Sequence, residues 1–86
     1  MAKFRKKPVV IEAEQFFRDK TPWPEGVEYI PPDEPKAWHH EQYIVDTLEG
    51  RALNVQDGDW IITGVHGERY PCKPDIFSET YEAVEA

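Results

Sequence analysis

The sequence predicts an α+β fold: a small, twisted and mostly antiparallel β-sheet, made of two hairpins and an N-terminal strand, with a short C-terminal helix. Two short turns that end in glycine, Glu49-Gly50 and His66-Gly67, each separate two segments of β-type residues. Lys73-Pro74-Asp75 is typical of a helix start, because proline suits the first helical position and an acid suits the first turn. A length of 86 residues allows one modest core, so we expect a single domain over residues 1–86.

The first predicted strand covers residues 8–17 and follows a basic N-terminal tail at residues 1–7. Apolar side chains at positions 9, 11 and 13 alternate with Glu12 and Glu14, as on a half-buried strand. Pro8 fits the start of the strand, where its missing N–H removes no ladder hydrogen bond.

Residues 18–41 are predicted to form a Pro-rich connecting loop, because five of the eight prolines fall there and periodic apolar spacing stops. Within this loop, residues 27–30 are compatible with a short edge strand. Trp23, Tyr29 and Trp38 argue against full disorder, since disordered segments are poor in aromatic residues. We expect these rings to fold back over the sheet.

The first hairpin joins residues 43–48 to residues 51–55. A two-residue turn at Glu49-Gly50 would place Ile44 opposite Val55 and Leu48 opposite Arg51. This register gathers the apolar residues of the hairpin on one face, namely Ile44, Leu48, Leu53 and Val55.

The second hairpin contains residues 60–63, a continuous apolar run that indicates a central strand buried on both faces. A two-residue turn at His66-Gly67 would pair Thr63 with Tyr70. Pro71 cannot donate to a ladder, so the strand that carries it belongs at an edge of the sheet.

The C-terminal helix is predicted from its start signal and from its apolar spacing. Phe77, Tyr81 and Val84 recur at helical intervals and form one face that can cover the sheet.

The charge is distributed unevenly along the chain. The net charge is −7, yet four of the ten bases lie in the N-terminal tail, which leaves residues 8–86 at −11 (6 bases minus 17 acids). An acidic body is repelled by a phosphate backbone, so nucleic acid is not expected as a partner.

Three observations favour a cytoplasmic protein. Glu12 and Glu14 interrupt the segment that would be the apolar core of a secretion signal. No apolar run approaches the roughly 18 residues that a membrane span needs, so no membrane association is expected. The single cysteine, Cys72, cannot form an intramolecular disulfide, which fits a reducing compartment.

Two strings of residues resemble a known family. They are Lys6-Lys-Pro-Val-Val-Ile-Glu-Ala and the cassette at residues 57–77, which ends in Pro-Cys-Lys-Pro-Asp-Ile-Phe. The chain resembles the small phage and prophage proteins named for a Pro-Gly-Asp-Tyr-Gly motif, although Gln56-Asp-Gly-Asp stands where Pro-Gly-Asp is usual and Trp60 stands for tyrosine. That family has no assigned activity. The resemblance implies a virus or prophage gene product that acts in a bacterial cytoplasm.

The junction between the second hairpin and the helix carries the candidate ligand-binding residues, which are Arg69, Tyr70, Cys72 and Lys73. A cation beside a helix N-terminus can bind a carboxylate or phosphate, although Asp75 can satisfy the first-turn amides itself. The charge of Lys73 would also lower the pKa of the neighbouring thiol and favour the reactive thiolate. His66, however, is expected about 20 Å from Cys72 at about 3.3 Å per residue, and buried structural cysteines are common.

The candidate partner-binding residues are Trp23, Trp38 and Trp60. His39-His40-Glu41 contains metal-ligand types, but adjacent histidines point to opposite sides of an extended chain and no second ligand cluster is near in sequence. We therefore predict no metal site, no cofactor and no catalytic residue.

The leading functional hypothesis is a non-enzymatic phage or prophage accessory protein that binds a host protein or a small anionic ligand, in a host-takeover or anti-defence role. One alternative is a small enzyme or thiol-dependent activity centred on Cys72, Lys73 and Tyr70. Another is a nucleic-acid accessory protein that uses the basic N-terminal tail. The sequence leaves the oligomeric state open.

Overall fold

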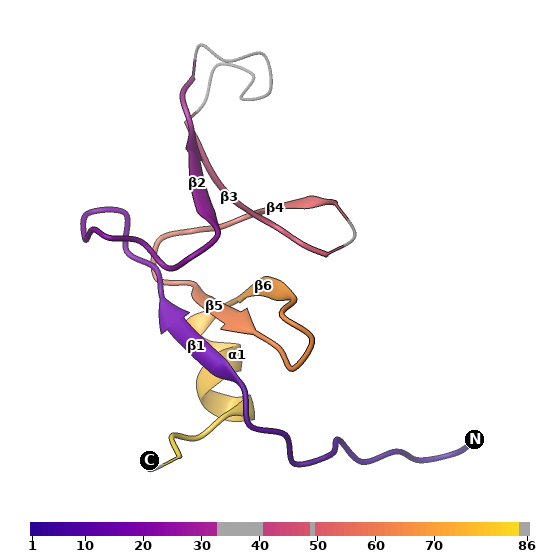
Figure 1. Cartoon of the computed structure of the whole chain (residues 1–86). Coiled ribbons are helices and arrows are strands. Elements are labelled where there is room, and N and C mark those ends of the chain that lie inside the picture. Colours follow the sequence, from indigo (N-terminus) through magenta and orange to yellow (C-terminus); the bar gives the residue numbers. More distant parts are fainter. Residues whose placement is uncertain (33–40, 49, 85–86) are drawn as a thin grey trace.

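The computed structural model describes residues 1–32, 41–48 and 50–84, and in these residues it contains six strands and one helix (Figure 1). In chain order they are β1 (Glu12–Gln15), β2 (Val27–Ile30), β3 (Gln42–Asp46), β4 (Ala52–Asn54), β5 (Trp60–Thr63), β6 (Arg69–Cys72) and α1 (Pro74–Thr80). None of the helical residues described forms a segment long and apolar enough to cross a membrane.

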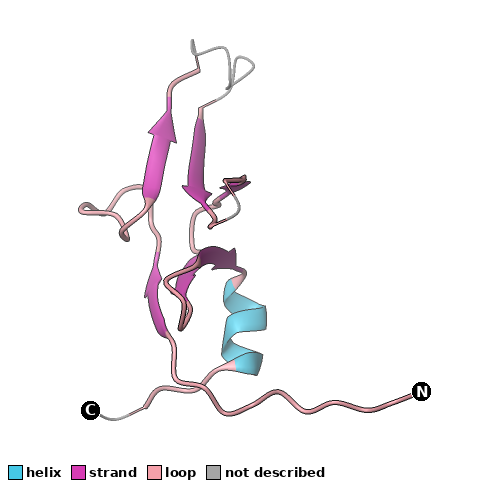
Figure 2. Cartoon of the chain, turned by 45° about the vertical axis from the view of Figure 1, so that its right-hand side comes forward, coloured by secondary structure: helices cyan, strands magenta, loops and turns pink. Residues whose placement is uncertain are grey.

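The strands divide between two antiparallel sheets of three strands each. The first sheet has the order β1-β5-β6 and the second the order β2-β3-β4. The second sheet and α1 lie at opposite ends of the molecule, with the first sheet between them (Figures 1 and 2). The predicted α+β class is therefore confirmed, with both hairpins, the N-terminal strand and the C-terminal helix. The sequence did not indicate that the two hairpins would join separate sheets.

Both hairpins are shifted by one residue from the predicted register, so the predicted pairings are wrong. Ile44 lies opposite Asn54 rather than Val55, and Thr63 lies opposite Arg69 rather than Tyr70. The strand types are nevertheless as expected. β5 is central in its sheet, with Ile61 and Ile62 both buried, and β6 with its proline is at the edge.

The shift comes from the loops, which hold three residues instead of two. In the second hairpin the Gly67 N–H donates to the Gly64 carbonyl at 3.0 Å, and the Gly64 N–H donates to the Glu68 carbonyl at 2.8 Å. Gly67 has a φ of +81°, the left-handed conformation that this loop type requires at its third position. The first hairpin repeats the pattern, because the Gly50 N–H donates to the Thr47 carbonyl and the Thr47 N–H to the Arg51 carbonyl.

The hydrophobic core lies between the two sheets. Its buried members are Phe16, Val45, Val55 and Ile61, with Trp23, Val27 and Tyr43 packed against them. Because of the register shift, Val45 rather than Ile44 shares the inner face of the second sheet with Leu53. Leu48, expected on the buried face, is 67% exposed.

The N-terminal strand is shorter than predicted, because β1 starts at Glu12 and not at Pro8. Glu12 pairs with Thr63, the last residue of β5, so residues 8–11 have no ladder partner on that strand. In the predicted connecting loop, residues 27–30 do form the edge strand β2, whereas residues 33–40 lie outside the described residues.

The helix begins at Pro74 as predicted but ends at Thr80, so the expected continuation through Val84 is wrong. Tyr81 is extended, with φ −123° and ψ 150°, and in this conformation it contacts Lys6 and Tyr70. Phe77 anchors the helix to the first sheet by stacking on Trp60, with ring centroids 4.2 Å apart and planes within 6°. This stack packs α1 against the sheet.

Candidate functional site

The candidate ligand-binding residues of the hairpin-helix junction are split between the two faces of the first sheet. Cys72 lies opposite Trp60 and Tyr70 lies opposite Ile62, so these four side chains share the face that α1 covers. Arg69, one residue before Tyr70, belongs to the other face. The structure thus brings Tyr70, Cys72 and Trp60 together and separates Arg69 from them.

Both cations of this junction already have partners within the chain. Arg69 forms an ion pair with Glu25 at 3.3 Å, and its side chain runs so close to Gly26 that a Cβ added there would lie 2.9 Å from the Arg69 Cδ. The Lys73 Nζ donates to the Gln56 side-chain oxygen at 3.1 Å. A small anion would have to compete with these contacts, and α1 itself has only seven residues.

The Cys72 thiol is not activated. Burial raises the pKa of the Cys72 thiol above its ordinary value of 9.0, the carboxylates of Asp59 and Asp75 raise it further, and Lys6 acts in the opposite direction. The thiol donates weakly to the Lys73 carbonyl at 3.6 Å, so it contacts the backbone of Lys73 and not its ammonium group. The expectation that Lys73 lowers this pKa is therefore wrong.

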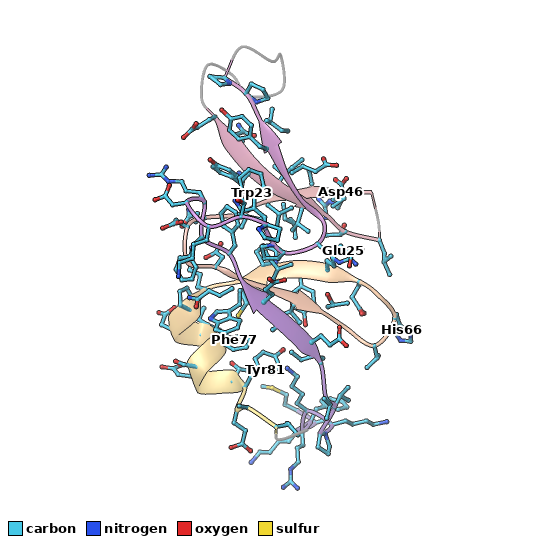
Figure 3. All side chains as sticks on the ribbon, turned by 60° about the vertical axis from the view of Figure 1, so that its left-hand side comes forward. Trp23, Glu25, Asp46, His66, Phe77 and Tyr81 are labelled. Carbon is cyan, nitrogen blue, oxygen red and sulfur yellow. The ribbon has the colours of Figure 1, made fainter. Side chains whose placement is uncertain are left out.

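His66 is also remote from this face. Figure 3 shows His66 at the tip of the second hairpin, away from Phe77 and Tyr81. No group of three or more metal-ligand side chains occurs among the described residues. His39 and His40, set aside as metal ligands from the sequence, lie outside the described part of the chain.

A tyrosine pair on the helix side holds the N-terminal segment, which sequence reasoning treated as a free tail. The Lys6 Nζ donates to the Tyr81 hydroxyl at 3.1 Å and lies 4.5 Å from the centre of that ring. Tyr70 also hydrogen-bonds Tyr81. Burial, followed by this hydrogen bond, raises the pKa of Tyr70 to about 12, whereas the hydrogen bonds from Lys6 and Tyr70 lower the pKa of Tyr81.

The three tryptophans proposed as partner contacts have different surroundings. Trp23 packs against Phe16 and Tyr43, with ring centroids 6.0 and 5.4 Å apart, and its indole N–H donates to the Arg18 carbonyl. Its position beside the core is visible in Figure 3. Trp60 is half-buried under Phe77. Both rings contribute to packing, and Trp38 lies outside the described residues.

A hollow of about 350 Å³ opens between the β3–β4 hairpin and β6, and we call it the inter-hairpin groove. Its lining consists of Thr47, Leu48, Arg51 and Leu53 from the hairpin and of Glu68, Arg69 and Tyr70 from the β6 side. Two of the residues singled out from the sequence, Arg69 and Tyr70, thus belong to it. Most of its exposed lining is apolar.

The groove continues the hydrophobic core to the surface. Leu53 is opposite the fully buried Val45, yet it is 38% exposed, and Leu48 beyond it is 67% exposed. Sequence reasoning missed Leu48 and Leu53 as surface residues because the assumed two-residue turn placed both on a buried face. A three-residue loop would have placed Leu48 in the turn and so indicated its exposure, whereas Leu53 stays on the face of Val45 and its exposure has no local sequence signal.

Comparison with known proteins identifies no relative of this chain: no protein-family model matches it, and neither a curated protein nor a solved structure is significantly similar.

Proposed function

We propose that this chain is a non-enzymatic phage or prophage accessory protein that acts in the bacterial host cytoplasm as a small binding module for a host protein. The inter-hairpin groove carries the proposal. It is a concave, mainly apolar surface continuous with the core, and exposed apolar concavities are where proteins bind partners. The phage assignment rests on the resemblance of residues 6–13 and 57–77.

A host protein is favoured over a small anionic ligand by the contacts of the junction cations. Arg69 is paired with Glu25 and Lys73 is bonded to Gln56, so both positive groups are engaged. A protein partner gains from burying Leu48 and Leu53, whereas a small anion gains nothing from these side chains.

The alternative of a thiol-dependent enzyme receives no support from the site. A thiol with a raised pKa is a poor nucleophile at neutral pH, because only the thiolate attacks. The nucleic-acid alternative relies on the basic side chains of the N-terminal tail, and one of these, Lys6, is already hydrogen-bonded to Tyr81.

Affinity capture from bacterial lysate tests the proposal. Tagged wild-type protein is expected to retain a host protein that the Leu48→Asp variant loses. Ile76→Asp is the matched control, because Ile76 is also a large exposed apolar residue, 51% exposed, and lies on α1 outside the groove. Retention of the same proteins by wild type and Leu48→Asp, or retention of none, would refute the proposal.

A thermal-shift screen with nucleotides tests the small-anion version in parallel. If a nucleotide stabilises the wild type but not Arg69→Ala, the protein binds an anionic ligand at the junction, and the proposal of a protein partner is wrong. We expect no such shift, because the guanidinium is already paired.

A further inference from the structure

Resting on the proposed function, we infer that the inter-hairpin groove binds an extended peptide segment of its partner in which a large apolar side chain stands next to a carboxylate. The apolar side chain would cover Leu48 and Leu53, and the carboxylate would pair with Arg51. The inference follows from the size of the groove, its charges and the strands beside it.

The groove has the size of a small pocket. Its volume of about 350 Å³ lies at the small end of the range for ligand pockets, about 300 to 1,000 Å³. Leu48 and Leu53 retain 67% and 38% of their exposure, so a partner side chain can remove apolar surface of both from water. A large aliphatic or aromatic side chain fits this requirement better than a polar one.

The charged part of the groove favours an acidic neighbour. Arg51 is exposed, and no acid of the described chain lies within ion-pair distance of its guanidinium. Arg69 is held by Glu25, and the Glu68 carboxylate accepts the N–H of His66 at 3.0 Å in the hairpin loop. Arg51 is therefore the group to which a partner carboxylate can bind in bidentate fashion.

The charge of the rest of the molecule sharpens this choice. Residues 8–86 carry −11 (6 bases minus 17 acids), so an acidic segment is repelled from most of the surface. Two of those six bases, Arg51 and Arg69, line this one groove. Within residues 8–86, an acidic segment is thus attracted by the groove and repelled by most of the remaining surface.

The strands beside the groove suit an extended backbone. β4 and β6 are each the last strand of their sheet, so each has one edge without a strand neighbour among the described residues. An extended segment can hydrogen-bond to such an edge while its alternate side chains enter a pocket.

Selection from a random decapeptide display library on the wild-type protein tests the inference. The enriched peptides are expected to share a large apolar residue adjacent to Asp or Glu. One enriched peptide, labelled with a fluorophore, should bind the wild type at least about tenfold more tightly than Leu48→Asp, which corresponds to the loss of one strong interface contact. Ile76→Asp should bind it like the wild type.

A charge exchange tests the role assigned to Arg51. Arg51→Glu should weaken the acidic peptide at least about tenfold, and replacing the peptide's acid by lysine should restore binding to that variant. Circular dichroism and thermal melts establish that each variant is folded. Because Leu48 and Arg51 are exposed, both variants are expected to fold.

Three results would overturn the inference: no enriched peptide, enriched peptides without an acidic residue, or equal affinity of the acidic peptide for wild type and Arg51→Glu. None of these results refutes the proposed function, which is tested separately by affinity capture from lysate. If lysate capture still depends on Leu48, the protein is a binding module whose partner has other chemistry.

Discussion

Alkylation of Cys72 decides between the binding module and the thiol enzyme. Cys72 is the chain's single cysteine, so a thiol reagent such as iodoacetamide reports on this group alone, and Cys72→Ser supplies the blank. The reaction rate follows the thiolate fraction. Because burial raises the pKa above 9.0, we expect the rate to climb about tenfold from pH 7 to pH 8 and to keep rising to pH 9 without a plateau.

The expected magnitude follows from the same pKa. At pH 7 a thiol with a pKa of 9.0 is ionised in about one molecule in a hundred, and the raised pKa leaves Cys72 below that fraction. An activated thiol of pKa 7 would be half ionised, which is about 50-fold more. The greater intrinsic nucleophilicity of the more basic thiolate recovers about eightfold of this difference. Cys72 should therefore react at least about sixfold more slowly than an activated thiol at pH 7.

Substitutions around Cys72 test the cause of the shift. Asp75→Asn should move the alkylation profile to lower pH, because the Asp75 carboxylate raises the thiol pKa, and Lys6→Ala should move it to higher pH. Lys73→Ala should leave it unchanged, since the Lys73 side chain bonds to Gln56. A rate plateau below pH 8 in the wild type would refute this reasoning, and so would a thiol pKa that is higher in Lys73→Ala than in the wild type. Either result would favour the thiol-dependent enzyme.

Three further predictions concern stability. Phe16→Ala should destabilise the protein by about 3–5 kcal/mol in urea unfolding, against about 4–13 kcal/mol in total for a chain of this length, because Phe16 is fully buried between the sheets. Phe4→Ala, at a side chain that is 95% exposed, should change the free energy of unfolding by less than about 0.5 kcal/mol. Equal urea midpoints for Phe16→Ala and Phe4→Ala would contradict the assignment of Phe16 to the core. Gly67→Ala should lower the free energy of unfolding by about 1–2 kcal/mol through the φ of +81° alone, because no atom lies within 4 Å of an added Cβ. Gly67→Asn should lower it less. An unchanged melting temperature for Gly67→Ala would exclude the three-residue loop. The pKa of Tyr70 is raised on folding from 10.0 to about 12, so its stabilising contribution is complete below pH 10 and is lost as the pH rises to 12. Tyr70→Phe should therefore lose less stability than the wild type between pH 10 and pH 12. An ultraviolet phenolate titration of this variant should lack the most alkaline step that the wild type shows.

Local sequence signals determined the elements of this protein but not their register. Proline at position 74, the apolar run of β5 and the proline in β6 each act through backbone geometry or burial within a few residues, so the helix start, the central strand and the edge strand were predictable. The glycine turns were recognised as well. Their loop length was not, because a glycine of positive φ serves both a two-residue and a three-residue loop.

The candidate site depended on the tertiary structure for the same reason. A shift of one residue reverses the faces of a strand, and it placed Val45 rather than Ile44 on the face that β3 shares with Leu53. The contacts of Arg69 with Glu25, of Lys73 with Gln56 and of Lys6 with Tyr81 join residues 17 to 75 positions apart. Sequence spacing carries no signal for such pairs. The sequence alone established which residue types this small acidic protein contains, and only the packing of its two sheets decided which of them lie exposed at the groove.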